Sequence, residues 1–149
     1  MPKTPAKSKA KSAGKSKTKS KARTKTRAKA RSKSKLRTLK KLDGFIGACL
    51  VDSESGMTLE ALGGGKRLDL EMAAAGNTEV VRAKRKIMQS LGLKDKIEDI
   101  LISLGGQYHI IRPLTVNDTI FVYLALDRES ASLGLARLKL REYEKTVEI

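Results

Sequence analysis

Residues 68–93 constrain the fold of this chain more than any other stretch, because their apolar positions repeat as in a long amphipathic helix. Apolar and small side chains recur every three or four residues and therefore share one helical face. They are Leu68, Met72, Gly76, Val80, Ala83, Ile87 and Leu91. Asp69 in the first turn complements the helix dipole, and Gly92 supplies a left-handed stop. We therefore expect a helix over 68–93 whose apolar face must be covered, most simply by the protein's own sheet.

The segments on either side of this helix have the composition of β-strands. Residues 44–51 are nearly all apolar or small, which is typical of a strand buried on both faces of a sheet. A turn that ends at Gly56 joins this strand to a second one at 57–62. After the long helix we expect a meander of strands at 97–104, 108–114 and 119–127.

Shorter helices are expected at both ends of this folded part. Residues 36–42 carry leucines three apart, a spacing that can start a helix packed on the domain. Ser130 or Ser132 can cap a last helix. The apolar positions of that helix are Leu133, Ala136, Leu140, Tyr143 and Val147. The sequence thus predicts an α+β fold, a five-stranded antiparallel sheet covered by helices on both faces, in the order α-β-β-α-β-β-β-α.

Positive charge divides the 149-residue chain into two regions. Residues 1–35 carry 15 of the 32 Lys and Arg residues and no acid, which leaves 17 basic and 16 acidic residues for the rest. This first region has no large apolar residue after Met1, so it cannot bury a core and we expect it to be disordered. The predicted organisation is therefore a basic tail over 1–35 and one domain over 36–149.

Within this tail, every odd position from 15 to 35 is basic. In an extended chain, alternate residues point to the same side, so these charges would form one ribbon. The ribbon consists of Lys15, Lys17, Lys19, Lys21, Arg23, Lys25, Arg27, Lys29, Arg31, Lys33 and Lys35. Such a ribbon suits a polyanion such as nucleic acid, and by composition the tail resembles those of linker histones and basic nucleoid proteins. The alternative is a solvated linker that binds acidic surfaces without selectivity.

Metal and nucleophile chemistry have few candidate residues. Cys49 is the single cysteine, so no internal disulfide is possible, and with His109 as the single histidine the usual zinc ligand sets cannot form. Both residues fall in predicted strands, where a structural role is usual. Glu98 and Asp99 are adjacent along a predicted strand, so we expect them to point to opposite faces as a solvated strand start. The sequence therefore predicts a protein that is not an enzyme.

The sequence matches neither a phosphate-binding loop nor a membrane-spanning segment. Gly63-Gly64-Gly65-Lys66 departs from a phosphate-binding loop, which needs Gly where Glu60 stands and Ser or Thr where Arg67 stands. No apolar run approaches the roughly 18 residues of a membrane helix, and the first residues lack the apolar core of a secretory signal. We expect no cofactor, no membrane span, and a cytoplasmic protein that associates with the nucleoid or, in a eukaryote, the nucleus.

The order of elements and several short motifs together resemble the Roadblock family of dynein light chains and prokaryotic GTPase partners, over about residues 36–148. The motifs are Gly44-Phe45-Ile46-Gly47-Ala48 leading to Val51-Asp52, the turn at Gly56, the Ala-rich long helix, Leu126-Asp127-Arg128, and Leu133-Gly134-Leu135-Ala136-Arg137. Ser132 stands where many relatives have Asn, which affects a helix cap rather than the fold. The resemblance implies a Roadblock/profilin-like fold and leaves the tail outside.

This resemblance implies a homodimer in which the long helices lie side by side and the third strands pair across a twofold axis. Transferred to this sequence, the contact uses Met72, Gly76 and Val80 on the helix, and Ile100, Leu101, Ile102 and Ser103 on the strand. An apolar strand at a sheet edge is an aggregation hazard unless it is paired, and twofold pairing removes that edge. The alternative is an intramolecular core without a dimer.

Two functions remain open from the sequence. In the first, the chain is a dimeric regulator or scaffold for a Ras-like small GTPase or a similar protein, and its tail localises it to a polyanion. In the second, it is a sequence-nonspecific DNA- or RNA-binding protein whose folded domain dimerises two basic tails. The folded part favours the first function and the charge of the tail favours the second.

Overall fold

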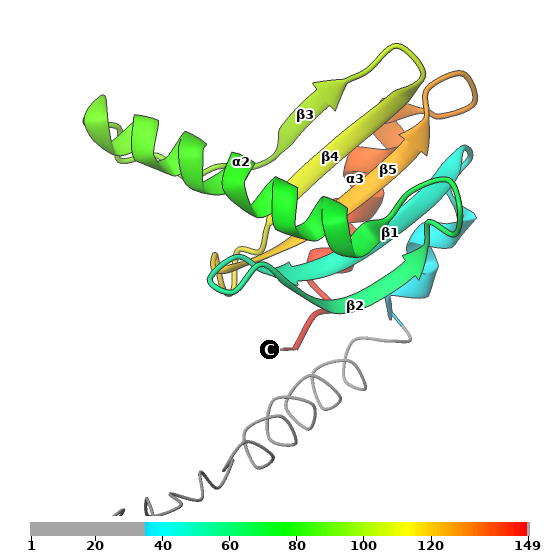
Figure 1. Ribbon diagram of the computed structural model, residues 1–149, viewed down its shortest axis with the longest axis horizontal. Helices are drawn as coiled ribbons and strands as arrows, with labels where there is room; N and C mark the ends of the chain where they lie inside the picture. Colours follow the sequence, from blue (N-terminus) through cyan, green and yellow to red (C-terminus); the bar gives the residue numbers. More distant parts are fainter. Residues whose placement is uncertain (1–34, 149) are drawn as a thin grey trace, which may run out of the picture.

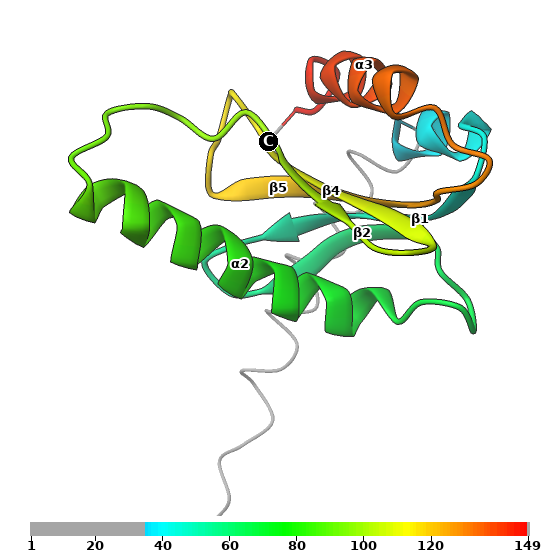
Figure 2. The same cartoon turned by 90° about the horizontal axis from the view of Figure 1, so that it is seen from above.

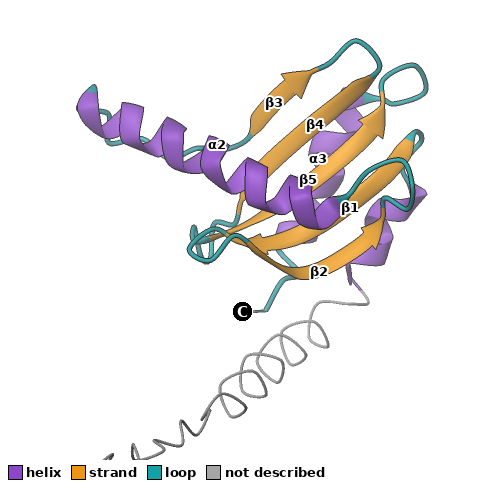
Figure 3. Cartoon of the chain, viewed as in Figure 1, coloured by secondary structure: helices purple, strands orange, loops and turns teal. Residues whose placement is uncertain are grey.

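The computed structural model describes residues 35–148, and the tail positions before Lys35 lie outside the described residues. One antiparallel sheet forms the centre, with strands in the order β2-β1-β5-β4-β3 (Figures 1 and 3). Along the chain the elements are η1 (Arg37–Lys41), β1 (Phe45–Asp52), β2 (Met57–Gly63), α2 (Leu70–Ser90), β3 (Ile100–Ser103), β4 (Gln107–Pro113), β5 (Ile120–Asp127) and α3 (Leu133–Glu144). The predicted α+β fold is confirmed.

The inner strands β1 and β5 explain the continuous apolar runs in the sequence. β5 lies between β1 and β4, and all its residues from Ile120 to Leu126 are buried. A strand with helices over both faces has no solvent side, so it needs no polar alternation. Gly56 has a φ of 75°, as the tight turn between β1 and β2 requires. β3 is shorter than predicted, covering Ile100–Ser103 rather than 97–104.

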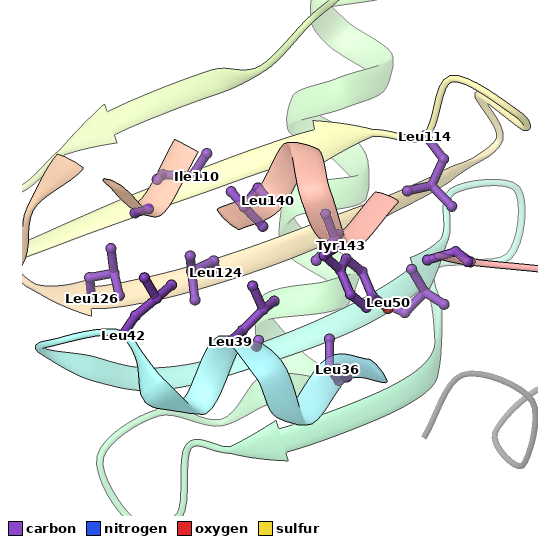
Figure 4. Packing of buried hydrophobic residues seen from close by; sticks show 14 of the residues in the cluster. Leu36, Leu39, Leu42, Leu50, Ile110, Leu114, Leu124, Leu126, Leu140 and Tyr143 are labelled. Carbon is purple, nitrogen blue, oxygen red and sulfur yellow. The ribbon is translucent and has the colours of Figure 1, made fainter. Parts of the chain in front are cut away.

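One face of the sheet is closed by η1 and α3 (Figures 2 and 4). η1 is a 3₁₀-helix with three residues per turn, so Leu36, Leu39 and Leu42 fall in one row and are all buried. Ser132, one of the two predicted caps, accepts a hydrogen bond from the Leu135 amide at the start of α3. The buried residues of α3 meet η1 over the sheet, and Leu140 is 1% exposed.

The opposite face is covered by α2, through a different stripe of the helix from the one predicted. Asp69 caps the helix by accepting from the Met72 amide at 3.0 Å. The buried residues of α2 are Leu70, Ala74, Thr78 and Val81. These positions also repeat every three or four residues, so periodicity alone does not distinguish the two stripes. The predicted stripe is longer, but only Leu68 and Val80 of it pack against the cluster under α2, whereas Met72 is 73% exposed.

Glu98 and Asp99 also differ from the prediction, because they precede β3 rather than start it. They do not diverge, since both carboxylates lie within 4.0 Å of the Arg112 guanidinium. The Asp99 side chain is only 9% exposed and accepts two hydrogen bonds from Arg137, at 2.9 and 3.1 Å. This carboxylate is therefore a buried ion-pair partner, not a solvated strand start.

Candidate interaction surface

The predicted dimer residues of α2 lie on the outside of the folded chain. Met72 is 73% exposed, and Val80 is partly buried at the edge of the helix contact. A Cβ atom at Gly76 would meet no atom within 4 Å. The helix backbone at Gly76 is therefore open to close approach by another surface, and nothing in residues 35–148 makes that approach.

The C-terminal half of α2 is exposed together with the residues that follow it. No residue of this helix after Val81 is buried. The apolar side chains Ile87, Leu91 and Leu93 are 51%, 65% and 51% exposed. Figures 1 and 2 show this half extending past the sheet. Helical segments of this length are marginal in water without tertiary packing, and its apolar stripe is the part that such packing would bury.

The third strand completes this surface at the edge of the sheet. β3 pairs with β4 on one side, and its other side is the end of the sheet. Ile100 and Ile102 pack against the cluster under α2, whereas Leu101 points to the other face and is 38% exposed. The backbone amides and carbonyls on the outer side of an edge strand can pair with a further strand. The predicted position of this strand at an edge is confirmed.

A groove of about 570 Å³ joins the helix to the edge strand. Val80 and Met88 line it from α2, Leu93 from the connecting loop and Ile100 from β3. Helix stripe, groove and strand edge are therefore contiguous. We refer to them together as the α2–β3 surface, which consists of Met72, Gly76, Val80, Ile87, Met88, Leu91, Leu93 and Ile100–Ser103.

Of the predicted polyanion-binding residues, only Lys35 belongs to the described part of the chain. Lys15 to Lys33 lie outside it, so their role stays a prediction. Lys35 lies inside, and its ammonium donates to the Thr146 carbonyl oxygen at 2.6 Å. This lysine therefore connects the start of the folded part to the segment that follows α3.

Cys49 is packed as a core residue on the face beneath α2. Its side chain is fully buried, and this burial raises the pKa of the thiol to about 12, with a smaller contribution from Glu71. A thiol with such a pKa is protonated at neutral pH, and only the thiolate is a strong nucleophile.

His109 belongs to a polar chain between β4 and β5. Its Nε2 lies 2.7 Å from Gln107 Oε1, and its Nδ1 lies 3.1 Å from the Tyr123 hydroxyl. Burial lowers the pKa of this imidazole, so the neutral form is favoured. Both ring nitrogens have a partner, which is the arrangement of a structural histidine.

The glycine-rich connection before α2 is a packing turn. Gly63 and Gly64 have φ values of 78° and 80°. A Cβ atom at Gly64 would lie 2.5 Å from the Leu68 carbonyl oxygen and 2.9 Å from the Leu70 side chain. Among the described residues no cluster of three or more His, Cys, Asp or Glu residues is arranged to hold a metal ion. Nor is any described helix both long enough and apolar enough to cross a membrane.

A buried charge cluster was not predicted from the sequence. Arg112 is 7% exposed and donates to Glu144 Oε1 at 2.7 Å, while its guanidinium lies 3.8 Å from Asp99 Oδ2. The second Glu144 oxygen accepts from the amide and the hydroxyl of Thr115, both at 3.2 Å. This cluster connects α3 to β4 and to the residues just before β3. A charged residue inside the apolar β4 sequence was its only signal.

The sheet order, the long helix on one face and the η1–α3 layer on the other give this α+β domain the fold of Roadblock/LC7 domains. Solved structures with this fold include "Myxococcus xanthus MglB", with 16% identity, TM-score 0.64, and coverage of 82% of this chain and 85% of that one. The Roadblock/LC7 domain from Streptomyces avermitilis has 14% identity, TM-score 0.63, and coverage of 73% and 87%. The gliding protein MglB from Thermus thermophilus has 15% identity, TM-score 0.67, and coverage of 80% and 87%.

These similarities establish the fold, as the sequence resemblance implied. No protein-family model matches the sequence, and neither does any curated protein.

Proposed function

We propose that this chain is a non-enzymatic, dimeric Roadblock-type regulator or scaffold for a Ras-like small GTPase or a similar protein, and that its basic tail binds polyanions. The observation that carries the proposal is the α2–β3 surface. This surface combines an overhanging apolar helix, an adjoining groove and an open strand edge on one side of the domain.

A twofold dimer would use every part of this surface. Antiparallel pairing of two copies of β3 would continue the sheet and satisfy the backbone groups of Ile100–Ser103. Side-by-side packing of two α2 helices would bury the stripe through Met72 and Ile87, with Gly76 permitting close approach. Self-association is also reported for a protein of the same fold, since one matched structure is described as "MglB with tetrameric arrangement".

A binding role accounts for the described side chains better than catalysis does. The single thiol is buried and held protonated, and the single imidazole has structural partners on both nitrogens. A nucleophile needs an adjacent base and access to its substrate. We therefore assign regulation to contacts with a protein partner.

The oligomeric state in solution tests the proposal. Light scattering of the full chain at tens of micromolar should give twice the mass of one chain. Ile87→Glu should shift the protein to the monomer, because this substitution places a charge in the contact without disturbing the monomer core. Leu138→Glu is the matched control, since Leu138 is 48% exposed on α3 and Ile87 is 51% exposed on α2. A wild-type monomer, or equal effects of both substitutions, would contradict the dimer.

The charge of the tail favours a second function, sequence-nonspecific binding of DNA or RNA with the folded domain as the dimeriser. Residues 1–35 contain 15 basic residues, no acid and no aromatic residue, so binding would depend on counterion release rather than on base stacking. Gel shift across a salt series should show strong binding by the full chain and a large loss when residues 1–34 are removed. Such a protein would reside with the nucleoid or, in a eukaryote, in the nucleus.

The two functions differ in what the folded domain must bind. If regulation of a GTPase is the main role, the domain without its tail should alter the nucleotide hydrolysis or exchange rate of a Ras-like partner. If the domain only dimerises, that rate should not change, while joining two tails should raise the affinity for nucleic acid through avidity. Measuring the nucleotide hydrolysis or exchange rate of the partner and the affinity for nucleic acid, each with the full chain and with the chain lacking residues 1–34, distinguishes the functions.

A further inference from the structure

The element that follows the tail presents cations on its outer surface. In a 3₁₀-helix, residues three apart lie above one another. The row of leucines in η1 faces the core, so the remaining rows face outward. One outward row contains Arg37 and Lys40, and the other contains Lys35, Thr38 and Lys41.

Within residues 35–148, three of these cations have no acidic partner. Lys35 is occupied by the Thr146 carbonyl oxygen. Arg37, Lys40 and Lys41 are exposed, and none of them forms an ion pair within residues 35–148. They lie on the sheet face opposite α2, as Figure 2 shows for η1, so the α2–β3 surface and these cations are accessible from different sides.

The basic part of the sequence therefore extends into the folded domain. The first acidic residue of the chain is Asp43. Arg37, Lys40 and Lys41 bring the acid-free stretch before it to 18 basic residues, and residues 43–149 have 14 basic and 16 acidic residues. The domain beyond η1 therefore has a small net negative charge, and η1 is the part of the folded chain that directly follows the tail.

We propose that η1 is an ordered anchor for the nucleic acid that the tail binds, with Arg37, Lys40 and Lys41 contacting consecutive phosphates at a fixed place on the domain. This inference rests on the proposed binding of polyanions by the tail. It adds a defined end to the contact, because a structured element holds its charges in one geometry. In a dimer formed through the α2–β3 surface, the two anchors would lie away from the dimer contact.

The composition of η1 favours nucleic acid over an acidic protein as the occupant. Protein interfaces usually depend on a few buried apolar or aromatic anchors. The apolar residues of η1 are all turned inward, with Leu36 and Leu39 0% and Leu42 8% exposed. Its outward rows offer positive charge, which is what contacts to a phosphate backbone require, whereas the Thr38 hydroxyl already donates to the Lys35 carbonyl oxygen at 2.8 Å.

The test compares two pairs of substitutions in the full chain, each of which removes two positive charges. Lys40→Gln/Lys41→Gln changes the anchor. Lys66→Gln/Lys86→Gln changes exposed lysines of the loop before α2 and of α2 itself, neither of which forms an ion pair among the described residues. Affinity for a short mixed-sequence DNA duplex is measured by fluorescence anisotropy from 50 to 200 mM salt.

If η1 contacts two phosphates through these lysines, the slope of log affinity against log salt should become shallower by about 1.8 in the anchor variant. The control variant should keep the wild-type slope. Bound duplex should also protect Lys40 and Lys41, but not Lys66 and Lys86, from acetylation in a mass-spectrometric footprint. Equal slopes for both variants, or no protection of the anchor lysines, would overturn the inference.

These failures differ from failure of the proposed tail function. If removal of residues 1–34 abolishes binding while the anchor variant binds as the wild type does, the tail binds nucleic acid and η1 does not. If the full chain does not bind the duplex at low salt, the tail function fails and the anchor fails with it. Thermal unfolding of both variants at the wild-type temperature confirms that the fold is intact.

Discussion

The two faces of the sheet are covered in different ways. The η1–α3 face encloses a large apolar cluster between two short elements, and Leu39, Leu124 and Leu140 are at most 1% exposed (Figure 4). The α2 face uses a much longer helix, yet no side chain of that helix after Val81 is buried. Helix length therefore does not measure how much a helix stabilises a fold. What matters is the apolar area that it removes from water.

The difference also separates structural from interaction residues. On the η1–α3 face, even charged groups are buried in pairs, as Arg112 and Glu144 are. On the outer side of α2, large apolar groups are left exposed, as Met72 and Leu91 are. We interpret the first face as the part that holds the monomer together and the second as the part available to another chain.

The largest expected effect is on the η1–α3 face, at the buried ion pair. Glu144→Ala should lower the free energy of unfolding by about 3–5 kcal/mol, because it leaves the Arg112 guanidinium buried without its 2.7 Å partner. Urea unfolding followed by circular dichroism measures this loss. Lys139, which forms an exposed pair with Glu142, provides the control, since Lys139→Ala should cost less than about 1 kcal/mol. Similar losses for the two substitutions would show that burial of the pair does not matter.

A somewhat smaller effect separates the apolar residues of the two faces. Leu140→Ala should cost about 2–5 kcal/mol, because it opens a cavity in the closed cluster. Ile87→Ala should cost well under 1 kcal/mol in the monomer, because this side chain is already half exposed. Unfolding at low protein concentration removes any contribution from a dimer. A large loss for Ile87→Ala under those conditions would mean that α2 is covered within the monomer.

Cys49 tests how tightly the α2 face is closed above the sheet. Cys49→Ser should lower the free energy of unfolding by about 1–3 kcal/mol, because it buries a hydroxyl at a position where the thiol is packed as an apolar group. Cys49→Ala removes the sulfur without adding a polar group, so it should be less destabilising. The two free energies come from the same urea titration. A serine variant as stable as the alanine variant would indicate that water reaches this position under α2.

The smallest effect is a pH dependence that only the α2 face should show, through His109. Burial lowers the pKa of this imidazole in the folded protein from its ordinary 6.5, so the unfolded chain binds the proton more readily. Stability should therefore be complete above about pH 6.5 and should fall as the pH drops from there towards the lowered value.

This contribution involves the uptake of at most one proton and should be absent from His109→Gln. Thermal unfolding of both proteins between pH 7.5 and 5.5 measures it. If the two proteins lose stability in parallel over this range, carboxylates rather than His109 are responsible.

Much of the fold was predictable because it depends on local patterns. The spacing of leucines over 36–42, the buried runs of β1 and β5 and the cap at Ser132 each act within a few residues, and all three are confirmed. The Roadblock fold itself is confirmed by the solved structures of the same architecture. The dimer contact and the binding of polyanions by the tail stay predictions, because they involve other molecules or residues outside the described part.

The sequence by itself determined the order of the elements, the division between an acid-free tail and a nearly neutral domain, and the existence of a helix with two stripes that the sheet could bury. Only the tertiary structure decided between those stripes. It selected the stripe of Leu70, Ala74 and Val81, because these side chains pack against the apolar residues that β1, β4 and β5 present beneath α2.

The tertiary structure also brought Asp99, Arg112 and Glu144 together, although they are far apart along the chain. Periodicity records which side chains share a face of one element, whereas the choice of a partner depends on the shape and charge that another element presents to it. That second piece of information is not contained in any single stretch of the sequence.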